Sequence, residues 1–272
     1  MKMILVACVL WALGCGEADR STRPEGARSD AAAGVDEPEP TGSGTTNTDP
    51  PRDRTGPRPP IDSYQKVRLT EEDVEQGRYK KYMGGKAETW DRRGAFQLHL
   101  ARELGLEPSH KFIDIGCGPI RGGVHLIDYL EAGNYWGFDY NEDFISAAKQ
   151  IVRDQGLETK RPTLLTVQEF DPTPLDSDFE FGLVFSVLQH TNEHNKRRFF
   201  EMIDEAFHPG AKVIITHAKW FDESYLESGV FEVTRALDSL AVLGSDETPI
   251  DWGWDPEKRD RMFPIVELTR VR

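Results

Sequence analysis

The feature that most constrains the fold is an alternation of short apolar runs with stretches of helical periodicity, over residues 112–216. The apolar runs have the length and flanking turns of buried strands, and the stretches between them repeat apolar residues at helical spacing. Strands that alternate with helices predict a parallel sheet with helices on both faces. The expected strands are 112–115, 135–139, 163–167, 181–188 and 212–216, and the expected helices are 123–130, 142–155 and 196–207.

Further elements flank this alternation. On the N-terminal side, Thr70 precedes the acidic run Glu71–Asp73 as a helix-capping hydroxyl does, and a second helix is expected over 87–104. The C-terminal run FPIVELTRVR, residues 263–272, is expected to add an antiparallel strand. We therefore predict one α/β domain over residues 63–272, with a mostly parallel sheet and a helical lead-in.

The residues before this domain differ from it in composition. Residues 1–15, MKMILVACVLWALGC, combine one lysine with a short apolar run and end in Gly14-Cys15, which resembles a bacterial lipoprotein signal. Residues 16–62 are rich in Pro, Gly, Ser, Thr and charge, which predicts a disordered linker. A translated Met1 implies a lipoprotein tethered to a membrane through Cys15, and a misassigned start implies a cytoplasmic protein.

Charge and cysteine content narrow the possible partners and compartments. The chain of 272 residues carries 33 Lys and Arg against 47 Asp and Glu, a net charge of -14. This charge repels a phosphate backbone, so we expect no nucleic-acid partner. Two of the three cysteines, Cys8 and Cys15, lie in the N-terminal apolar segment. Cys117 is then the one thiol of the domain, which is typical of an intracellular protein.

A glycine-rich turn follows the first expected strand, in KFIDIGCGPIRGGVH, residues 111–125. Ligands of open α/β sheets bind at the carboxyl ends of the strands, and Gly116 and Gly118 allow a tight turn and a close ligand approach. A dinucleotide site requires a third glycine in register, but Arg121 occupies that position. The carboxylate of Asp114, at the strand end, also repels a pyrophosphate. An NAD-dependent oxidoreductase is therefore the weaker alternative.

The position of Asp114 favours a ligand that carries an ammonium group near the turn. S-adenosylmethionine fits, because it has an ammonium, a carboxylate and a sulfonium and no phosphate. Asp139 ends the next expected strand, at the spacing from Gly118 of an acid that accepts ribose hydroxyls. The two acids together predict S-adenosylmethionine at this turn.

Several ordered motifs carry a family resemblance. DIGCG, residues 114–118, with GFD ending at Asp139, resembles the class I S-adenosylmethionine-dependent methyltransferases. VQEF, then FEFGLVFSVLQH, and Pro209-Gly210 before AKVIIT resemble the elements of strands three to five in that family. The resemblance covers roughly residues 79–216 and implies a Rossmann-like fold. The R-G-G sequence at 121–123 is similar to that of a bacterial subgroup.

The resemblance also implies a set of cofactor-binding residues at the strand ends. Asp114 and the glycine turn would line the methionine end, and Asp139 would hold the ribose. Tyr140, Glu169 and Phe170 would surround the adenine, and Ser186 would pass close to the sulfonium. Arg121 would meet the methionine carboxylate or have a structural role. The implied set is Asp114, Gly116, Cys117, Gly118, Asp139, Tyr140, Glu169, Phe170 and Ser186.

The residues after the fourth and fifth strands bear on catalysis. His190 is the expected general base or substrate contact. His190 and His194 have the spacing of two ligands on one helix face, but a third ligand is not evident, so we expect no metal. His217 is expected to be a solvated loop residue. Trp252 and Trp254 are expected to form either a lid or substrate wall, or a satellite core under a long insertion.

The loop after the fourth strand reads SVLQHTNEH and lacks an N-P-P-Y-type motif for amide methylation. Together with the acidic charge, this disfavours a nucleic-acid or glutamine acceptor. We expect a small-molecule oxygen or nitrogen acceptor. The alternative is a catalytically inactive ligand-binding module on the same fold.

Overall fold

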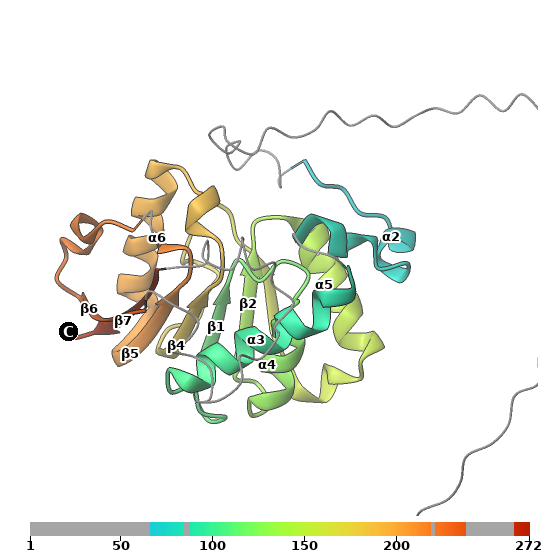
Figure 1. Ribbon diagram of the computed structural model, residues 1–272, viewed down its shortest axis with the longest axis horizontal. Coiled ribbons are helices and arrows are strands. Elements are labelled where there is room, and N and C mark those ends of the chain that lie inside the picture. The colour runs from blue at the N-terminus through green and yellow to red at the C-terminus, as the bar shows by residue number, and fades with distance from the viewer. Residues whose placement is uncertain (1–65, 84–86, 219–220, 238–263) are drawn as a thin grey trace, which may run out of the picture. The chain divides into compact units, whose positions relative to one another are not determined.

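The computed structural model describes residues 66–83, 87–218, 221–237 and 264–272 (Figure 1). The chain divides into two units, residues 1–54 and 55–272, and all described residues belong to the second. The signal-like segment 1–15, the linker 16–62 and the tryptophans Trp252 and Trp254 lie outside the described residues. In the described ranges, no helix is long and apolar enough to cross a membrane.

The core of the domain is a seven-stranded sheet in the order β3-β2-β1-β4-β5-β7-β6. The neighbours from β3 to β5 pair in parallel, and β7 is antiparallel to both β5 and β6. This mostly parallel sheet, with an antiparallel C-terminal strand, confirms the predicted fold class. The strands are β1 (Phe112–Ile115), β2 (Tyr135–Asp139), β3 (Thr163–Thr166), β4 (Phe179–Val184), β5 (Phe207–Ile215), β6 (Phe231–Leu237) and β7 (Ile265–Arg270).

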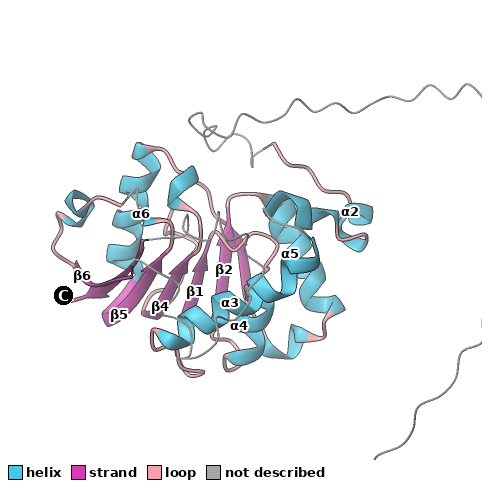
Figure 2. Cartoon of the chain, viewed as in Figure 1, coloured by secondary structure: helices cyan, strands magenta, loops and turns pink. Residues whose placement is uncertain are grey.

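Helices cover both faces of the sheet (Figures 1 and 2). The helices α3, α4 and α5 bury their apolar residues with one set of strand side chains, and α6 packs with the alternate set. The α-helices are α2 (Glu71–Glu75), α3 (Trp90–Glu103), α4 (Gly123–Tyr129), α5 (Glu142–Asp154) and α6 (Glu193–Ala206). Short 3₁₀ helices are η1 (Arg78–Met83), η2 (Ala87–Thr89), η3 (Leu157–Lys160), η4 (Leu188–His190) and η6 (Glu223–Leu226).

Local capping explains where three of the helices begin. Thr70 forms the predicted capping box with Asp73 at the start of α2. The side chain of Asn141 accepts two backbone hydrogen bonds at the start of α5, and Asn192 caps α6 in the same way. The cap at Asn192 starts α6 at Glu193, three residues earlier than apolar spacing alone predicts.

Strand ends also differ from the prediction. The strand β4 ends at Val184 instead of residue 188, because Ser186 has a left-handed φ of 63° and η4 follows. The strand β6 was not predicted from the sequence. Most of its side chains are exposed, so it lacks the apolar alternation that indicates a strand.

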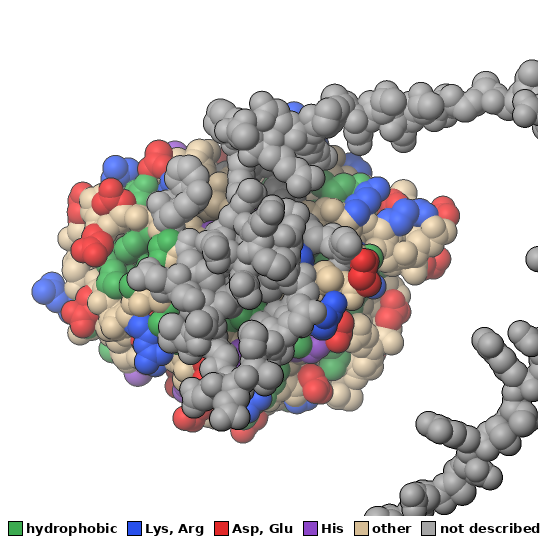
Figure 3. All heavy atoms as spheres, viewed as in Figure 1, with side chains coloured by type: hydrophobic (Ala, Val, Ile, Leu, Met, Phe, Trp, Pro, Cys, Tyr) green, Lys and Arg blue, Asp and Glu red, His purple; other side chains and the backbone are tan. Residues whose placement is uncertain are grey.

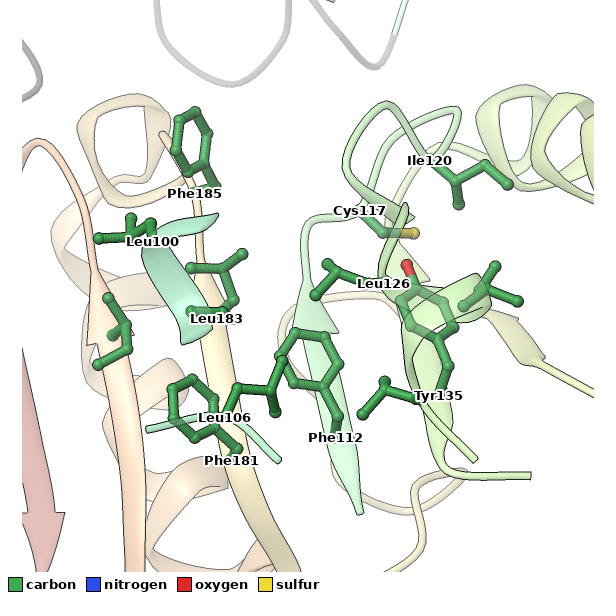
Figure 4. Close-up of a cluster of buried hydrophobic side chains, with 14 of the residues drawn as sticks. Leu100, Leu106, Phe112, Cys117, Ile120, Leu126, Tyr135, Phe181, Leu183 and Phe185 are labelled. Carbon is green, nitrogen blue, oxygen red and sulfur yellow. The ribbon is translucent and has the colours of Figure 1, made fainter. Parts of the chain in front are cut away.

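A cluster of buried hydrophobic side chains packs along β1, β2 and β4 (Figure 4). Phe112 of β1 stacks on Tyr135 of β2 and on Phe181 of β4, with ring centroids 5.9 Å and 6.1 Å apart. Leu100 of α3 belongs to the same cluster and is fully buried. The packing fixes β1, β2 and β4 relative to one another, and with them the turns that follow these strands.

Candidate functional site

The strand order places the site at the carboxyl ends of β1 and β4. The chain winds from β1 outward to β3 on one side and from β4 to β5 on the other. The connections therefore diverge between β1 and β4, and ligands of open α/β sheets bind at such a point. The predicted site residues follow β1, β2, β3 and β4, so the fold brings them to one edge of the sheet.

The turn after β1 requires glycine at Gly116. Its backbone has a φ of +76°, and a Cβ there would lie 2.5 Å from Cγ2 of Val187. The N–H groups of Gly116 and Cys117 both donate to the carbonyl of Phe138 at 2.9 Å. The turn after β1 is thus fastened to β2 and approached closely by the loop after β4.

Asp139, at the end of β2, is a second fastening point for the turn. Its Oδ2 accepts the backbone N–H of Gly118 at 3.0 Å, and its Oδ1 accepts that of Asn141 at 2.9 Å. The carboxylate is buried, and burial raises its pKa to about 6 although these N–H donors act to lower it. Each oxygen keeps a further lone pair for a hydroxyl donor.

Asp114, the third residue of β1, is the most buried acid of the site, at 2% exposure. Its Oδ2 accepts a hydrogen bond from the hydroxyl of Tyr135 at 2.9 Å. Burial raises the pKa of Asp114 to about 7, and the charge of Asp139 adds to the rise. A cation bound beside this pair would relieve both effects, because it favours the ionised carboxylates. A positively charged group at this position would therefore favour the ionised form of both acids.

Cys117 lies between the two glycines and is buried. Burial raises the pKa of its thiol well above the ordinary value, and the charges of Asp114 and Asp139 add to the rise. A nucleophilic cysteine needs the opposite, an exposed thiol of lowered pKa. The role of Cys117 is accordingly to pack within the turn.

Left-handed backbone conformations gather after the strands at this edge. Glu169 and Phe170 have φ values of 50° and 55° after β3, and Ser186 and His217 have values of 63° and 59° after β4 and β5. Such conformations are costly for residues with a Cβ and are concentrated at functional sites. They mark the edge where the sequence predicts the ligand.

The residues predicted around the adenine follow β2 and β3. Tyr140 is half-buried, and its carbonyl accepts a hydrogen bond from Nε2 of Gln168 at 2.7 Å. Glu169 is exposed, and its carbonyl accepts Nε of Arg198 at 2.7 Å. Phe170 packs edge-on against Phe138 at 6.4 Å and so belongs to the core beneath α6.

Ser186 and His217 join the ends of β4 and β5. Oγ of Ser186 lies 3.0 Å from Nδ1 of His217, and the backbone N–H of Ser186 donates to Oγ1 of Thr216 at 2.9 Å. The expectation that His217 is solvated is wrong, because it is 9% exposed. The hydrogen bond to Ser186, which no sequence pattern indicates, holds its ring at the site.

His190 and His194 do not share a helix face. His190 lies in η4 and is half-buried, whereas His194 is exposed on α6, and the extended residues Thr191 and Asn192 separate the two helices. In the part of the chain that the structure describes, no three His, Cys, Asp or Glu side chains form a group that could hold a metal ion.

Arg121 and the two glycines after it connect the turn to the lead-in. Nη1 of Arg121 donates to the carbonyl of Met83 at 3.0 Å, and its guanidinium lies 5.7 Å from the ring of Trp90. A Cβ at Gly122 would lie 2.2 Å from Oε1 of Gln97 in α3. These contacts connect the turn to η1 and α3, as the structural alternative for Arg121 requires.

The geometry fits S-adenosylmethionine. Asp114 offers a buried acid to the ammonium, and Asp139 offers acceptors to the ribose, while the side chain of Val187 packs beside Gly116. Sequence reasoning missed Tyr135 and Thr216, which hold Asp114 and Ser186. Tyrosine and threonine within apolar strands are typical core residues, so only the fold reveals their hydrogen bonds.

Comparisons with known proteins bear on the fold and on residues 113–213. Residues 113–213 match the family model described as a methyltransferase domain. The chain is similar to a SAM-dependent methyltransferase from Aquifex aeolicus, with 14% identity over 75% of this chain and 100% of that one, and a TM-score of 0.50. It is also similar to a TehB-like SAM-dependent methyltransferase from Corynebacterium glutamicum, with 15% identity over 74% of this chain and 97% of that one, and a TM-score of 0.49.

The sheet order, the antiparallel β7 and the glycine turn after β1 define a class I methyltransferase fold, which the Aquifex structure shares. The matched residues 113–213 extend from β1 into β5 and contain Asp114, Asp139 and Ser186. The fold is that of the class I S-adenosylmethionine-dependent methyltransferases, and the match to a methyltransferase domain model covers residues 113–213. The predicted fold is confirmed, and the domain match over residues 113–213 agrees with the predicted resemblance to methyltransferases.

Proposed function

We propose that the domain binds S-adenosylmethionine and transfers its methyl group to a small-molecule oxygen or nitrogen acceptor. The observation that carries this proposal is the pair of buried acids, Asp114 and Asp139, on either side of the glycine turn. Burial raises the pKa of each. Two such carboxylates are costly in an empty site, and a ligand with an ammonium and two ribose hydroxyls satisfies both.

The chain's own residues then orient the reactants. When bound, S-adenosylmethionine supplies a methyl group activated by a sulfonium. Asp114 binds the ammonium, Asp139 accepts the ribose hydroxyls, and Ser186 lies where β4 approaches the turn. Such a site accelerates the reaction mainly by fixing the distance and direction of attack and by excluding water.

An acceptor hydroxyl or ammonium must also lose a proton. His190 is our candidate base, because it follows β4 and is half-buried at the site edge. His217 is a second candidate, since its hydrogen bond to Ser186 holds the ring between the ends of β4 and β5. The imidazole takes the proton of a hydroxyl as its oxygen gains the methyl group. It takes the proton of an ammonium before the attack, because only the neutral amine has a lone pair for the new bond.

The proposed class of methyl acceptor is based on the sequence of the loop after β4 and on the distribution of charged side chains on the surface. The loop 186–194 after β4 lacks the amide-methylation motif. On the face in Figure 3, acidic and basic side chains are interspersed over the described residues. Phosphate backbones are bound by continuous basic surfaces, so this mixed surface supports a small acceptor.

Calorimetric titration of S-adenosylmethionine into the full chain tests the cofactor proposal, with an Asp139→Ala variant beside it. We expect saturable binding that this variant loses. An Asp176→Asn variant is the matched control, because Asp176 is exposed and pairs with Lys111 instead of the turn. A folded wild-type chain that does not bind would overturn the proposal, and binding of NAD instead would favour an oxidoreductase.

A labelled-methyl assay tests the acceptor class. The full chain is incubated with methyl-labelled cofactor and a cell extract, which is then separated into small molecules, protein and nucleic acid. We expect label in the small-molecule fraction and loss of labelling in a His190→Gln or His217→Gln variant that still binds the cofactor. Label in nucleic acid or protein would refute the acceptor class. Binding without any transfer would identify an inactive binding module.

A further inference from the structure

The hydroxyl of Tyr135 is buried directly beneath the glycine turn. Tyr135 is the first residue of β2 and is 1% exposed. Figure 4 shows its hydroxyl at the end of the ring that lies toward Cys117. This hydroxyl donates to Oδ2 of Asp114 at 2.9 Å. The buried hydroxyl of Tyr135 in β2 therefore contacts the carboxylate of Asp114 in β1 from inside the protein core.

Two glycines leave the space that this hydroxyl occupies. A Cβ at Gly123, the first residue of α4, would lie 2.5 Å from Oη of Tyr135, and a Cβ at Gly137 in β2 would lie 2.9 Å from it. Gly123 is also the second glycine of the R-G-G sequence at residues 121–123. No cofactor contact was assigned to this glycine, and the Tyr135 hydroxyl explains why a side chain does not fit there. Gly137 is the register partner of Asp114. Two separate glycine positions, one in α4 and one in β2, thus leave room for the hydroxyl that makes this hydrogen bond.

Titratable and charged groups face Asp114 from β2 and from the turn. Tyr135 and Asp139 belong to β2, and Cys117 and Arg121 belong to the turn. The neighbouring strand β4 presents Leu183 at the register of Asp114. Burial and the charge of Asp139 favour the protonated acid.

The hydrogen bond from Tyr135 is the largest effect that opposes burial of the Asp114 charge, and the charge of Arg121 acts in the same direction. Burial raises the pKa of the Tyr135 hydroxyl well above its ordinary value. The hydroxyl therefore stays protonated and remains a donor throughout the neutral range. A permanent donor fixes which Asp114 oxygen is occupied and leaves the other for a ligand.

We propose that Tyr135 is a positioning residue for the cofactor, whose hydroxyl keeps Asp114 ionised and oriented toward the ammonium of S-adenosylmethionine and thereby sets the lower pH limit of cofactor binding. This inference rests on the proposed function, in which Asp114 binds that ammonium. The Tyr135→Phe variant removes the hydroxyl and leaves the ring packing. Without the donor, ionised Asp114 is less stable, so the acid takes up a proton at a higher pH.

Two measurements on the full chain test the inference. The first follows the carboxyl carbon of Asp114 by ¹³C NMR between about pH 5 and about pH 9 in the ligand-free protein. The second measures calorimetric affinity for S-adenosylmethionine over the same range. For Tyr135→Phe, we expect both midpoints to move up by about one pH unit and the affinity at about pH 7 to fall about fivefold.

The chain offers a matched variant and a matched ligand as controls. The hydroxyl of Tyr129 in α4 donates to the carbonyl of Leu106 at 3.0 Å, so Tyr129→Phe loses a comparable hydrogen bond away from Asp114. We expect Tyr129→Phe to keep the wild-type midpoints. 5′-Methylthioadenosine lacks the amino-acid end of the cofactor, and its affinity should be the same for Tyr135→Phe and the wild type.

The outcomes separate this inference from the proposed function. A wild type that does not bind the cofactor overturns both. A wild type that binds, with a Tyr135→Phe variant that has the same two midpoints, overturns the inference alone. An equal loss of affinity for 5′-methylthioadenosine also overturns it, because the change is then a general loss of structure. Shifted midpoints with unchanged 5′-methylthioadenosine affinity support it.

Discussion

The carboxylate of Asp139 accepts the backbone N–H of Gly118 at 3.0 Å, so the acid that ends β2 also holds the turn that follows β1. Its second oxygen accepts the N–H of Asn141 at 2.9 Å, at the start of α5. One side chain therefore links the shape of the turn, the start of a helix and the proposed ribose contact. A substitution at Asp139 is expected to affect stability and binding together.

The Asp139→Asn variant tests this link. An amide has one acceptor oxygen and one donor nitrogen, so one of the two buried N–H groups loses its acceptor. We expect the free energy of unfolding to fall by about 1–3 kcal/mol and the affinity for S-adenosylmethionine to fall at least about tenfold. Urea unfolding and calorimetry measure the two effects. An unfolding free energy equal to that of the wild type would contradict the fastening role.

Asp114 makes the stability of the ligand-free protein depend on pH. Burial raises its pKa from 3.8 to about 7, so the folded state binds more protons than the unfolded state between these values. The free energy of unfolding therefore falls as pH rises through that window. Stability from this group is complete at low pH and is lost above about pH 7, where cofactor binding by the ionised acid is strongest.

The Asp114→Asn variant separates the two effects. Its Oδ1 can still accept the Tyr135 hydroxyl, but the side chain does not titrate. At about pH 8 we expect the ligand-free variant to be more stable than the wild type by about 4 kcal/mol, while it loses cofactor binding. At about pH 4 the two should be equally stable. Thermal unfolding at both pH values measures this, and a constant difference across pH would refute it.

The strands β1 and β2 were predicted with the bounds that the structure shows. Both are apolar runs that end in a short acidic or glycine segment, so local sequence marks their limits. The ends of β4 and the whole of β6 were not predicted. Backbone turns after the strand determine the end of β4, and pairing with β7 determines β6. Such tertiary effects leave little trace in apolar spacing.

The candidate site, like the strands, has residues that the sequence predicts and residues that it does not. Asp114, the two glycines and Asp139 could be predicted because each has a chemical reason at a fixed spacing. Tyr135 and His217 could not, because their partners lie on neighbouring strands. Tyr135, at the start of β2, reaches Asp114 of β1 only because these two strands are neighbours in the sheet.

Gly94 shows how closely the lead-in packs on the turn. It lies within α3, and a Cβ there would be 2.2 Å from the carbonyl oxygen of Arg121 and 2.8 Å from Cδ2 of His125. Helix propensity alone predicts that Gly94→Ala stabilises by about 1 kcal/mol. The overlap with backbone reverses this sign, and we expect a net loss of about 1–3 kcal/mol in unfolding free energy.

The neighbouring Ala95 supplies the control for this prediction. Ala95→Gly changes propensity in the opposite direction and introduces no overlap, so a loss of about 1 kcal/mol is expected. Chemical unfolding of both variants gives the comparison. An increase in stability for Gly94→Ala would show that α3 can move away from the turn, and that its contact with Arg121 does not hold the lead-in.

Gly116 and Gly156 allow backbone strain to be distinguished from steric overlap. Their φ values are similar, +76° and +68°, but a Cβ at Gly156 has no atom within 4 Å, whereas one at Gly116 lies 2.5 Å from Val187. Alanine at either position carries the cost of a left-handed backbone, about 1–2 kcal/mol. We expect Gly116→Ala to lower the free energy of unfolding by about 1–3 kcal/mol more than Gly156→Ala does, and to weaken cofactor binding.

A second substitution then tests the contact itself. Val187→Ala shortens the side chain that approaches the turn, so it should restore part of the stability and affinity that Gly116→Ala loses. The same change should not improve Gly156→Ala, because Gly156 lies away from Val187. Unfolding and calorimetric titration of the two double variants measure this coupling. If Val187→Ala had equal effects in both backgrounds, the contact between the turn and the loop after β4 would not explain the requirement for glycine at residue 116.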